Sequence, residues 1–333
     1  TFSIRSVVMR FLSHLSRLFP DRFTLMLIST ITLASFLPCQ GITAIIFNQI
    51  ADIAIALLFF LHGAKLSRGA VLAGITHWRL HLLVMSLTFL FFPIIGLLLQ
   101  PLLTPLVGPV IYQGILYLCC LPATVQSAIA FTSMAKGNVP AAVCSASASS
   151  LLGIFVTPIL VSLVLAKGTG SSDLHGISKI LLQLLLPFVT GHLLQPWIGG
   201  FVTKHKKVLG IVDRGSILLV VYTAFSAAVI EHLWSTVPMR SLLGLLVACV
   251  VILAVALLSS RLLSRRLGFS VPDEITIVFC GSKKSLVSGV PMAKVLFAGA
   301  HLGPILLPIM LFHQIQLMVC AVLAQRYAKR VIK

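Results

Sequence analysis

Two adjacent lysines, Lys283 and Lys284, interrupt the apolar stretch "VFCGSKKSLVSGVPM" of residues 278–292. A charged side chain inside a membrane span is costly unless it faces protein, water or a partner, and it often marks an ion or substrate pathway. Burial disfavours the charged form of an amine, so such a lysine can supply either a permanent or a proton-switchable positive charge. The pair indicates a site for an ion or an anion. The alternative is that both lysines only satisfy carbonyl groups freed by a helix break.

The composition is that of a membrane protein. Hydrophobic residues make up 58% of the 333 residues and charged residues only 10%, whereas about a quarter of the residues of a soluble domain are charged. Period-2 alternation is absent, which excludes a barrel. The fold class is therefore an all-α polytopic protein in a lipid bilayer. The net charge of +18 does not indicate a nucleic-acid partner, because Lys and Arg lie between the apolar stretches, where they orient membrane proteins.

The charge-free stretches predict ten transmembrane helices, each of about 20 residues. We expect them at 23–38, 44–64, 79–100, 112–135, 139–166, 178–199, 214–232, 241–261, 274–299 and 303–326. Residues 1–22 are expected to form an amphipathic segment on the cytoplasmic surface. This arrangement places nineteen Lys and Arg residues on the cytoplasmic side and three outside. It therefore predicts a multi-pass protein with both termini in the cytoplasm.

Two expected spans are irregular, the fourth and the ninth. The fourth, "CCLPATVQSAIAFTSMAKGN", contains Pro122, and the ninth contains Gly281, Gly289 and Pro291. Interrupted helices at matching positions in two halves are typical of transporter binding sites. The spans divide into halves of five at 23–166 and 167–333, and an odd number inverts one half relative to the other. The alternative is that Pro and Gly only kink packed helices.

Several polar residues converge on the middle of the membrane. Lys283 and Gln126 each lie ten residues inside their spans, which is about 15 Å, and Asp52 lies about 20 Å inside the second span. Asp52 is the only acidic residue deep in an expected span. We expect it to be the partner or proton acceptor of Lys283, with Asn48 one turn away. The alternative is a structural hydrogen-bond cluster.

The stretch "LCCLPATVQSAIAFTSMAKGNVPAAVCSASASSLLGIFVTPIL" resembles the bile acid:sodium symporter family. The shared features are a Cys-Cys-Pro segment, an Ala-Lys-Gly-Asn run, a serine-rich helix and a final Thr-Pro pair. They correspond here to Cys119, Cys120, Pro122, Ala135–Asn138, the serines of 145–150 and Thr157–Pro158. Through "HGAKLS", "ATVQSAIAFTS" and "FCGSKKSL" the chain is most similar to the branch called sodium/bile acid cotransporter seven-like, which includes bacterial symporters.

The resemblance implies an inverted repeat of two five-helix units. Spans 1, 2, 6 and 7 would form a panel, and spans 3–5 and 8–10 would form a core in which broken helices four and nine cross. A small organic anion would bind between core and panel, and a monomer would carry it by alternating access. Na+ is the coupling ion that the family suggests. No other cofactor is expected.

This chain departs from the family at most sodium ligands. The family's ninth span carries a Glu-Val-Gly-Met-Gln-Asn-Ser-Gly run, and its third, fourth and fifth spans supply further ligands. The corresponding positions here are Phe279, Lys283, Ser127, Ala128, Ala142, Ala146 and Thr88. We therefore hypothesise that Lys283, together with Lys284, supplies positive charge where relatives bind sodium. Proton coupling is what these residues permit, and the identity of any metal stays open.

The candidate substrate or ion site follows from these arguments. It consists of Lys283, Lys284, Ser282, Ser285, Gln126, Ser127, Thr124, Ser145, Ser149, Thr88, Asp52 and Asn48. The serines could instead only permit close helix packing. Gln314 and Gln316 are weaker candidates, and the histidines of the spans, His62 and His313 among them, are interpreted as packing or interfacial residues.

Two functions other than transport can be weighed against it. One is a non-transporting regulator of cellular ion homeostasis, which the divergence from the family allows. The other is an intramembrane enzyme, but the sequence has no His-Glu-x-x-His, Gly-x-Ser-x-Gly or paired intramembrane aspartates. We therefore expect no enzyme activity and a symporter-type transporter.

Overall fold

The computed structural model describes residues 22–65, 77–165, 174–230, 232, 237–297 and 302–330. Within these ranges every regular element is a helix, as the composition predicts. The expected amphipathic segment 1–22 lies outside the described residues except for Arg22.

The helices follow the expected spans closely. They are α2 (Arg22–Phe36), α3 (Gly41–Lys65), α5 (Trp78–Ser86), the π-helix η1 (Leu87–Phe91), α6 (Phe92–Leu98), α7 (Gln100–Val107), α8 (Pro109–Cys120), α9 (Gln126–Met134), α10 (Val139–Leu165), α11 (Leu174–Lys204), α12 (Lys206–Ile230), α14 (Met239–Arg266), α15 (Val271–Gly281), α16 (Leu286–Leu296) and α17 (Leu302–Arg330). The fourth and ninth spans are each divided into two helices. The short helix α7 was not predicted.

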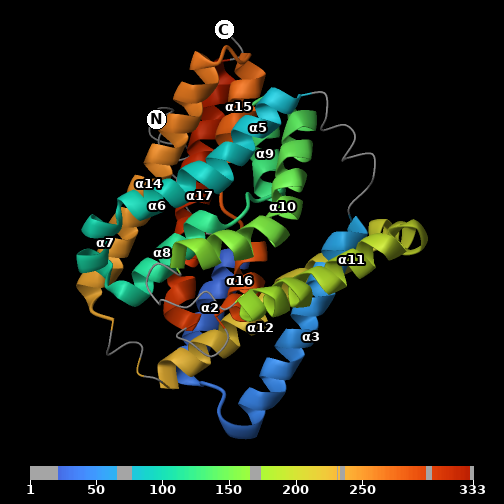
Figure 1. Cartoon of the computed structure of the whole chain (residues 1–333), viewed down its shortest axis with the longest axis vertical. Coiled ribbons are helices and arrows are strands. Elements are labelled where there is room, and N and C mark those ends of the chain that lie inside the picture. The colour runs from blue at the N-terminus through green and yellow to red at the C-terminus, as the bar shows by residue number, and fades with distance from the viewer. Residues whose placement is uncertain are drawn as a thin grey trace, which may run out of the picture.

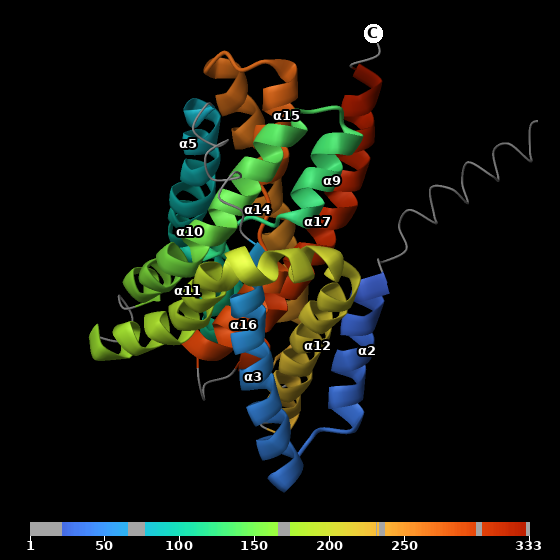
Figure 2. The ribbon, with the colours of Figure 1, turned by 90° about the vertical axis from the view of Figure 1, so that its right-hand side faces the viewer.

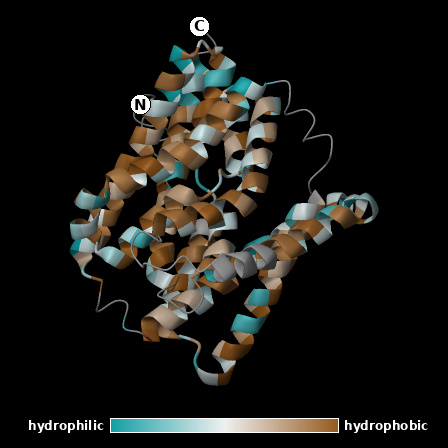
Figure 3. Cartoon of the chain, viewed as in Figure 1, coloured by the Kyte–Doolittle hydropathy of each residue, from teal (hydrophilic) through white to brown (hydrophobic). Residues whose placement is uncertain are grey.

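Six helices in the described ranges are long and apolar enough to cross a membrane. They are Gly41–Ala64, Trp78–Leu98, Val139–Leu165, Lys207–Ile230, Met239–Arg266 and Leu302–Lys329. Apolar residues predominate over most of the ribbon, and polar residues gather mainly toward helix ends (Figure 3). Large apolar side chains such as Leu243, Val247 and Leu258 of α14 are exposed. Such a surface is suited to lipid, so the chain is a multi-pass membrane protein.

The helices form two groups, one toward each end of the molecule (Figures 1 and 2). The four-helix group consists of α2, α3, α11 and α12, which contact one another. The main group consists of the other helices, and it contacts the four-helix group through α10, α16 and α17. The division into a panel and a core stays a prediction, as does their movement against each other.

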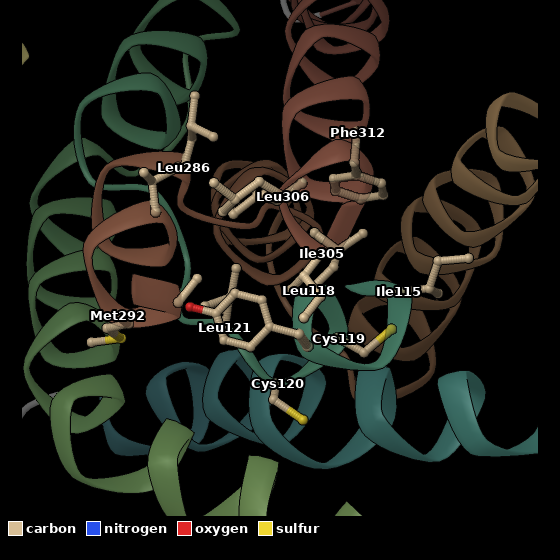
Figure 4. Packing of buried hydrophobic residues seen from close by; sticks show 14 of the residues in the cluster. Ile115, Leu118, Cys119, Cys120, Leu121, Leu286, Met292, Ile305, Leu306 and Phe312 are labelled. Atoms are coloured by element: carbon tan, nitrogen blue, oxygen red, sulfur yellow. The ribbon is translucent and has the colours of Figure 1, made fainter. Parts of the chain in front are cut away.

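An apolar cluster surrounds both helix interruptions in the main group (Figure 4). Leu118 and Leu121 at the end of α8 belong to the same cluster as Leu286 of α16, and Leu306 and Phe312 of α17; all five side chains are fully buried. This packing holds the ends of the broken helices against α17.

The helices α3 and α11 approach each other closely through two glycines. A Cβ atom on Gly63 would lie 2.0 Å from the carbonyl oxygen of Phe188, and one on Gly191 would lie 2.0 Å from that of Phe60. No side chain larger than hydrogen fits at either contact. The two glycines therefore set the spacing of the four-helix group, as small residues do in membranes.

We predict that Gly63→Ala forces α3 and α11 apart and lowers the free energy of unfolding by about 1–3 kcal/mol, the usual cost of overpacking. Thermal unfolding in detergent measures the change. The control is Gly200→Ala in α11, where an added Cβ meets nothing within 4 Å. Equal melting temperatures for the two variants would contradict the close-contact explanation.

Candidate functional site

The two helix interruptions meet inside the main group. One interruption lies between Cys120 of α8 and Gln126 of α9, and the other between Gly281 of α15 and Leu286 of α16. The N–H group of Ser285 donates to the carbonyl oxygen of Pro122 at 2.9 Å, which joins the two interruptions. The predicted breaks are confirmed. In the ninth span, however, Gly289 and Pro291 lie within α16, and the break itself falls at residues 282–285.

Lys284 reaches from one break into the other. Its Nζ donates to the carbonyl oxygens of Thr88, Cys119 and Leu121, each at 2.8 Å. It also lies 4.1 Å from the centre of the Phe92 ring, and the residue is 0% exposed. The three carbonyls, which we call the carbonyl cage, belong to the π-helix η1 and to the end of α8, where regular helical hydrogen bonding is interrupted.

Gln316 of α17 holds the main chain of Lys284. Its Oε1 accepts from the Lys284 N–H at 3.0 Å, and its Nε2 donates to the Lys284 carbonyl oxygen at 3.0 Å. The Gln316 side chain is fully buried. The sequence suggested a weak pocket residue, but Gln316 instead satisfies both main-chain groups of one residue in the break.

Lys283 points away from the carbonyl cage. Its Nζ donates to the carbonyl oxygen of Ser127 in the first turn of α9 at 3.1 Å. It lies 3.8 Å from the centre of the Phe131 ring and 5.7 Å from that of Phe279. The sequence hypothesis gave Lys283 the leading role. In the structure Lys284 has the richer cation environment, with three carbonyl oxygens against one.

A cavity of about 440 Å³ lies beside the two breaks, between the main group and the four-helix group. From the main group its wall includes Thr124, Gln126, Ser127, Ser147, Ser150, Ser285, Ser288 and His313. From the four-helix group it includes Phe23, His62, Phe188, Asp213, Arg214 and Ile217. The first turns of α9 and α16 thus both line the cavity. Helix N-termini carry N–H groups without helical partners and favour negative charge.

Four predicted site residues, Thr124, Gln126, Ser127 and Ser285, line this cavity. The hydroxyl groups of Thr124 and Ser127 lie 2.6 Å apart. Lys283, Lys284, Ser282 and Thr88 are fully buried and are not among the lining residues. The predicted site therefore splits into a cavity wall and a layer behind it.

The serines of α10 also split between two faces. Ser145 and Ser149, which the sequence predicts as site residues, make hydrogen bonds inside the main group. The Ser145 hydroxyl lies 2.6 Å from His81 Nδ1, and the Ser149 hydroxyl accepts from the Ala123 N–H at 3.0 Å. The residues of α10 that line the cavity include Ser147 and Ser150 instead.

Asp52 and Asn48 lie at a different contact. Asp52 Oδ1 is 2.8 Å from Nζ of Lys294, and the same Nζ donates to the Asn48 carbonyl oxygen at 3.1 Å. The expected pairing of Asp52 with Lys283 is therefore wrong. The Asp52–Lys294 pair instead links α3 of the four-helix group to α16 of the main group.

The residues of the crossing do not fit a resident sodium ion. An ammonium group already occupies the carbonyl cage. Phe279, Ala142 and Ala146, which stand at expected ligand positions, are fully buried in apolar clusters. Among the described residues no group of three or more His, Cys, Asp or Glu could hold a metal.

Sequence reasoning missed four charged or titratable residues of the cavity wall, namely His62, His313, Asp213 and Arg214. The sequence indicates packing or interfacial roles for the histidines. The expected seventh span begins at residue 214, but α12 begins at Lys206, so Asp213 and Arg214 both lie two turns inside the helix. The available signal was an Asp-Arg pair flanked by glycines in the run "LGIVDRGS".

We predict that Gln316→Leu lowers the free energy of unfolding by about 2–4 kcal/mol, because two buried main-chain groups of Lys284 lose their partners. Gln316→Glu keeps an acceptor for the N–H group and should cost less. Chemical or thermal unfolding in detergent checks the order, with the exposed Val322→Ala on the same helix as the control. A Gln316→Leu protein as stable as this control would contradict the proposed hold on the break.

The comparisons with known proteins agree with this architecture. The sequence matches the SBF-like CPA transporter family over residues 21–329. It is 67% identical over 315 residues to "Uncharacterized protein PA2026" of Pseudomonas aeruginosa, covering 94% of this chain and 95% of that protein. It is 57% identical over 310 residues to "Putative symporter YfeH" of Escherichia coli K12, covering 93% of each.

A vertebrate relative extends the comparison. Over 277 residues the chain is 31% identical to "Sodium/bile acid cotransporter 7" of Mus musculus, with 82% of each chain covered. The family is one of transporters and not of enzymes, and two of these relatives are named as a symporter and a cotransporter. The full-length match, together with broken helices that meet beside a cavity, establishes that this chain belongs to the SBF-like CPA transporter family.

Proposed function

We propose that this protein is a secondary active transporter that moves a small organic anion across the bacterial inner membrane by alternating access. The observation that carries the proposal is the cavity of about 440 Å³ where both broken helices meet the four-helix group. Its volume falls within the range of about 300–1,000 Å³ that is usual for small-molecule sites. Family membership supports transport as the activity.

The cavity wall favours an anion with an apolar body. The first turns of α9 and α16 offer hydroxyls, including those of Ser127 and Ser288, and the positive ends of two helix dipoles to a carboxylate or similar group. Arg214 supplies a positive charge from the opposite wall, and Phe23 and Phe188 supply apolar surface. We therefore place the anionic group of the substrate near the helix breaks and its apolar part against the four-helix group.

Alternating access would move the four-helix group, as a panel, against the main group, as a core. This proposal includes an inverted repeat of residues 23–166 and 167–333, a monomer, and both termini in the cytoplasm. The cavity is lined by Phe23 near the start of α2 and His62 near the end of α3. These helix ends carry the cytoplasmic charges, which supports a cavity open to the cytoplasm. The Asp52–Lys294 pair would then close the outer side.

The coupling ion is either sodium or a proton. Sodium appears in the name of the vertebrate cotransporter relative. A proton is the ion that His62 and His313 of the cavity wall, and the buried lysines, could exchange. The assay must therefore vary sodium and pH independently.

We predict that small carboxylates and sulfonates raise the melting temperature of the purified protein, and that a stabilising compound is taken up by proteoliposomes under a sodium or proton gradient. Arg214→Ala should weaken its binding about tenfold or more, because a charge-assisted hydrogen bond is lost. The control is Lys207→Ala, an exposed residue of the same helix.

Two outcomes would contradict the proposal. One is that no organic anion is bound or transported by folded protein under any gradient, which would favour a non-transporting regulator of ion homeostasis. The other is that Arg214→Ala and Lys207→Ala bind the anion equally, which would move the substrate away from this cavity.

A further inference from the structure

The environment of Lys284 resembles a binding site for a singly charged cation. An ammonium group has three N–H donors, and the three carbonyl oxygens of the cage each accept one at 2.8 Å. The face of the Phe92 ring lies 4.1 Å away and adds a further attraction for positive charge. The match in number and distance leaves no donor of the ammonium group unused.

The cage contains no carboxylate. The carboxylates of Asp52 and Glu274 pair elsewhere, Asp52 with Lys294 and Glu274 with Arg261 and Arg265. Divalent cations bind preferentially to carboxylates, whereas rings of main-chain carbonyl oxygens bind K+ by replacing its hydration shell. The chemistry of the cage therefore selects for a monovalent cation.

We propose that the carbonyl oxygens of Thr88, Cys119 and Leu121 form a monovalent-cation site that Lys284 fills with its own ammonium group, so that Na+ or K+ enters only when this side chain is removed. The inference rests on the proposed function in one respect only. Its consequence for a transporter is that transport by the wild-type protein requires no sodium ion at this position.

The cage should survive loss of the lysine side chain. Its oxygens are main-chain atoms of η1 and α8, and both elements are fixed by neighbouring packing, with Leu87, Phe92 and Leu118 fully buried. The Lys284 peptide itself is held by Gln316 and not by its own side chain. Truncation thus leaves three inward-directed oxygens without a donor, which is costly in a dry interior and is relieved by a bound cation.

A matched comparison separates this proposal from a purely structural lysine. Lys283 is equally buried, but its Nζ donates to only one carbonyl oxygen, that of Ser127, and packs on aromatic rings. Removing its side chain exposes no cage of oxygens. Lys283→Ala is therefore the control for the general loss of a buried amine.

The test measures the melting temperatures of wild type, Lys284→Ala and Lys283→Ala in detergent, with chloride salts of Na+, K+ and choline at equal ionic strength. We expect Na+ or K+ to raise the melting temperature of Lys284→Ala by several degrees, with saturation, whereas choline does not. Wild type and Lys283→Ala should show no difference among the three salts. Lys284→Gln, which brings an uncharged amide donor to the cage, should show a smaller cation effect.

The proposal is overturned if both Lys284 variants are equally stable in all three salts, or if wild type shows the same cation-selective rise. It is also overturned if neither variant can be isolated folded from sodium- or potassium-containing buffer, because the cation is expected to replace the ammonium group. None of these measurements needs a substrate or transport, so they can fail or succeed independently of the proposed function.

Discussion

The ammonium group of Lys284 satisfies the carbonyl groups at the point where the broken helices meet. A helix that stops inside a membrane protein leaves carbonyl groups without partners, and each is expensive where no water can reach it. Lys284, which comes from the break between α15 and α16, satisfies Cys119 and Leu121 at the end of α8 and Thr88 in η1. The Ser285 N–H in turn bonds to Pro122 in the other break. Each interruption is therefore stabilised by groups from the other.

This arrangement separates the supply of positive charge from the polar wall of the cavity, whereas a sodium-binding crossing would combine the two. The positive charge lies behind the cavity wall and is part of the chain, whereas the cavity wall carries hydroxyls and helix N-termini. Ser127 and Ser285 connect the layers, because both line the cavity, while the Ser127 carbonyl oxygen accepts from Lys283 and Ser285 follows Lys284 directly. A ligand that shifted these segments would also disturb the cage. The Asp52–Lys294 pair crosses the boundary between the two helix groups elsewhere and would have to break if they moved apart.

Much of the fold could be predicted, because the length, charge and hydropathy of each segment are properties of the sequence itself. Hydropathy and charge predict the spans, and Pro122 predicts the break in the fourth span. The cost of buried charge singles out the two lysines in the break of the ninth span. Rotation about a helix axis could not be predicted in α10, because its serines and apolar residues do not separate into a polar face and an apolar face. Its cavity face carries Ser147 and Ser150 instead of Ser145 and Ser149. The position of Asp52 along its span likewise predicts that it lies near the middle of the membrane. That position does not predict which lysine Asp52 faces. The seventh helix starts earlier than expected, so Asp213 and Arg214 were missed.

A high-resolution experimental structure of the wild-type protein in saturating sodium chloride tests most directly whether the ammonium group of Lys284 fills the carbonyl cage. We expect Nζ of Lys284 to lie among the carbonyl oxygens of Thr88, Cys119 and Leu121, with no metal ion between them. A sodium ion coordinated by these oxygens, with the Lys284 side chain turned away, would contradict it.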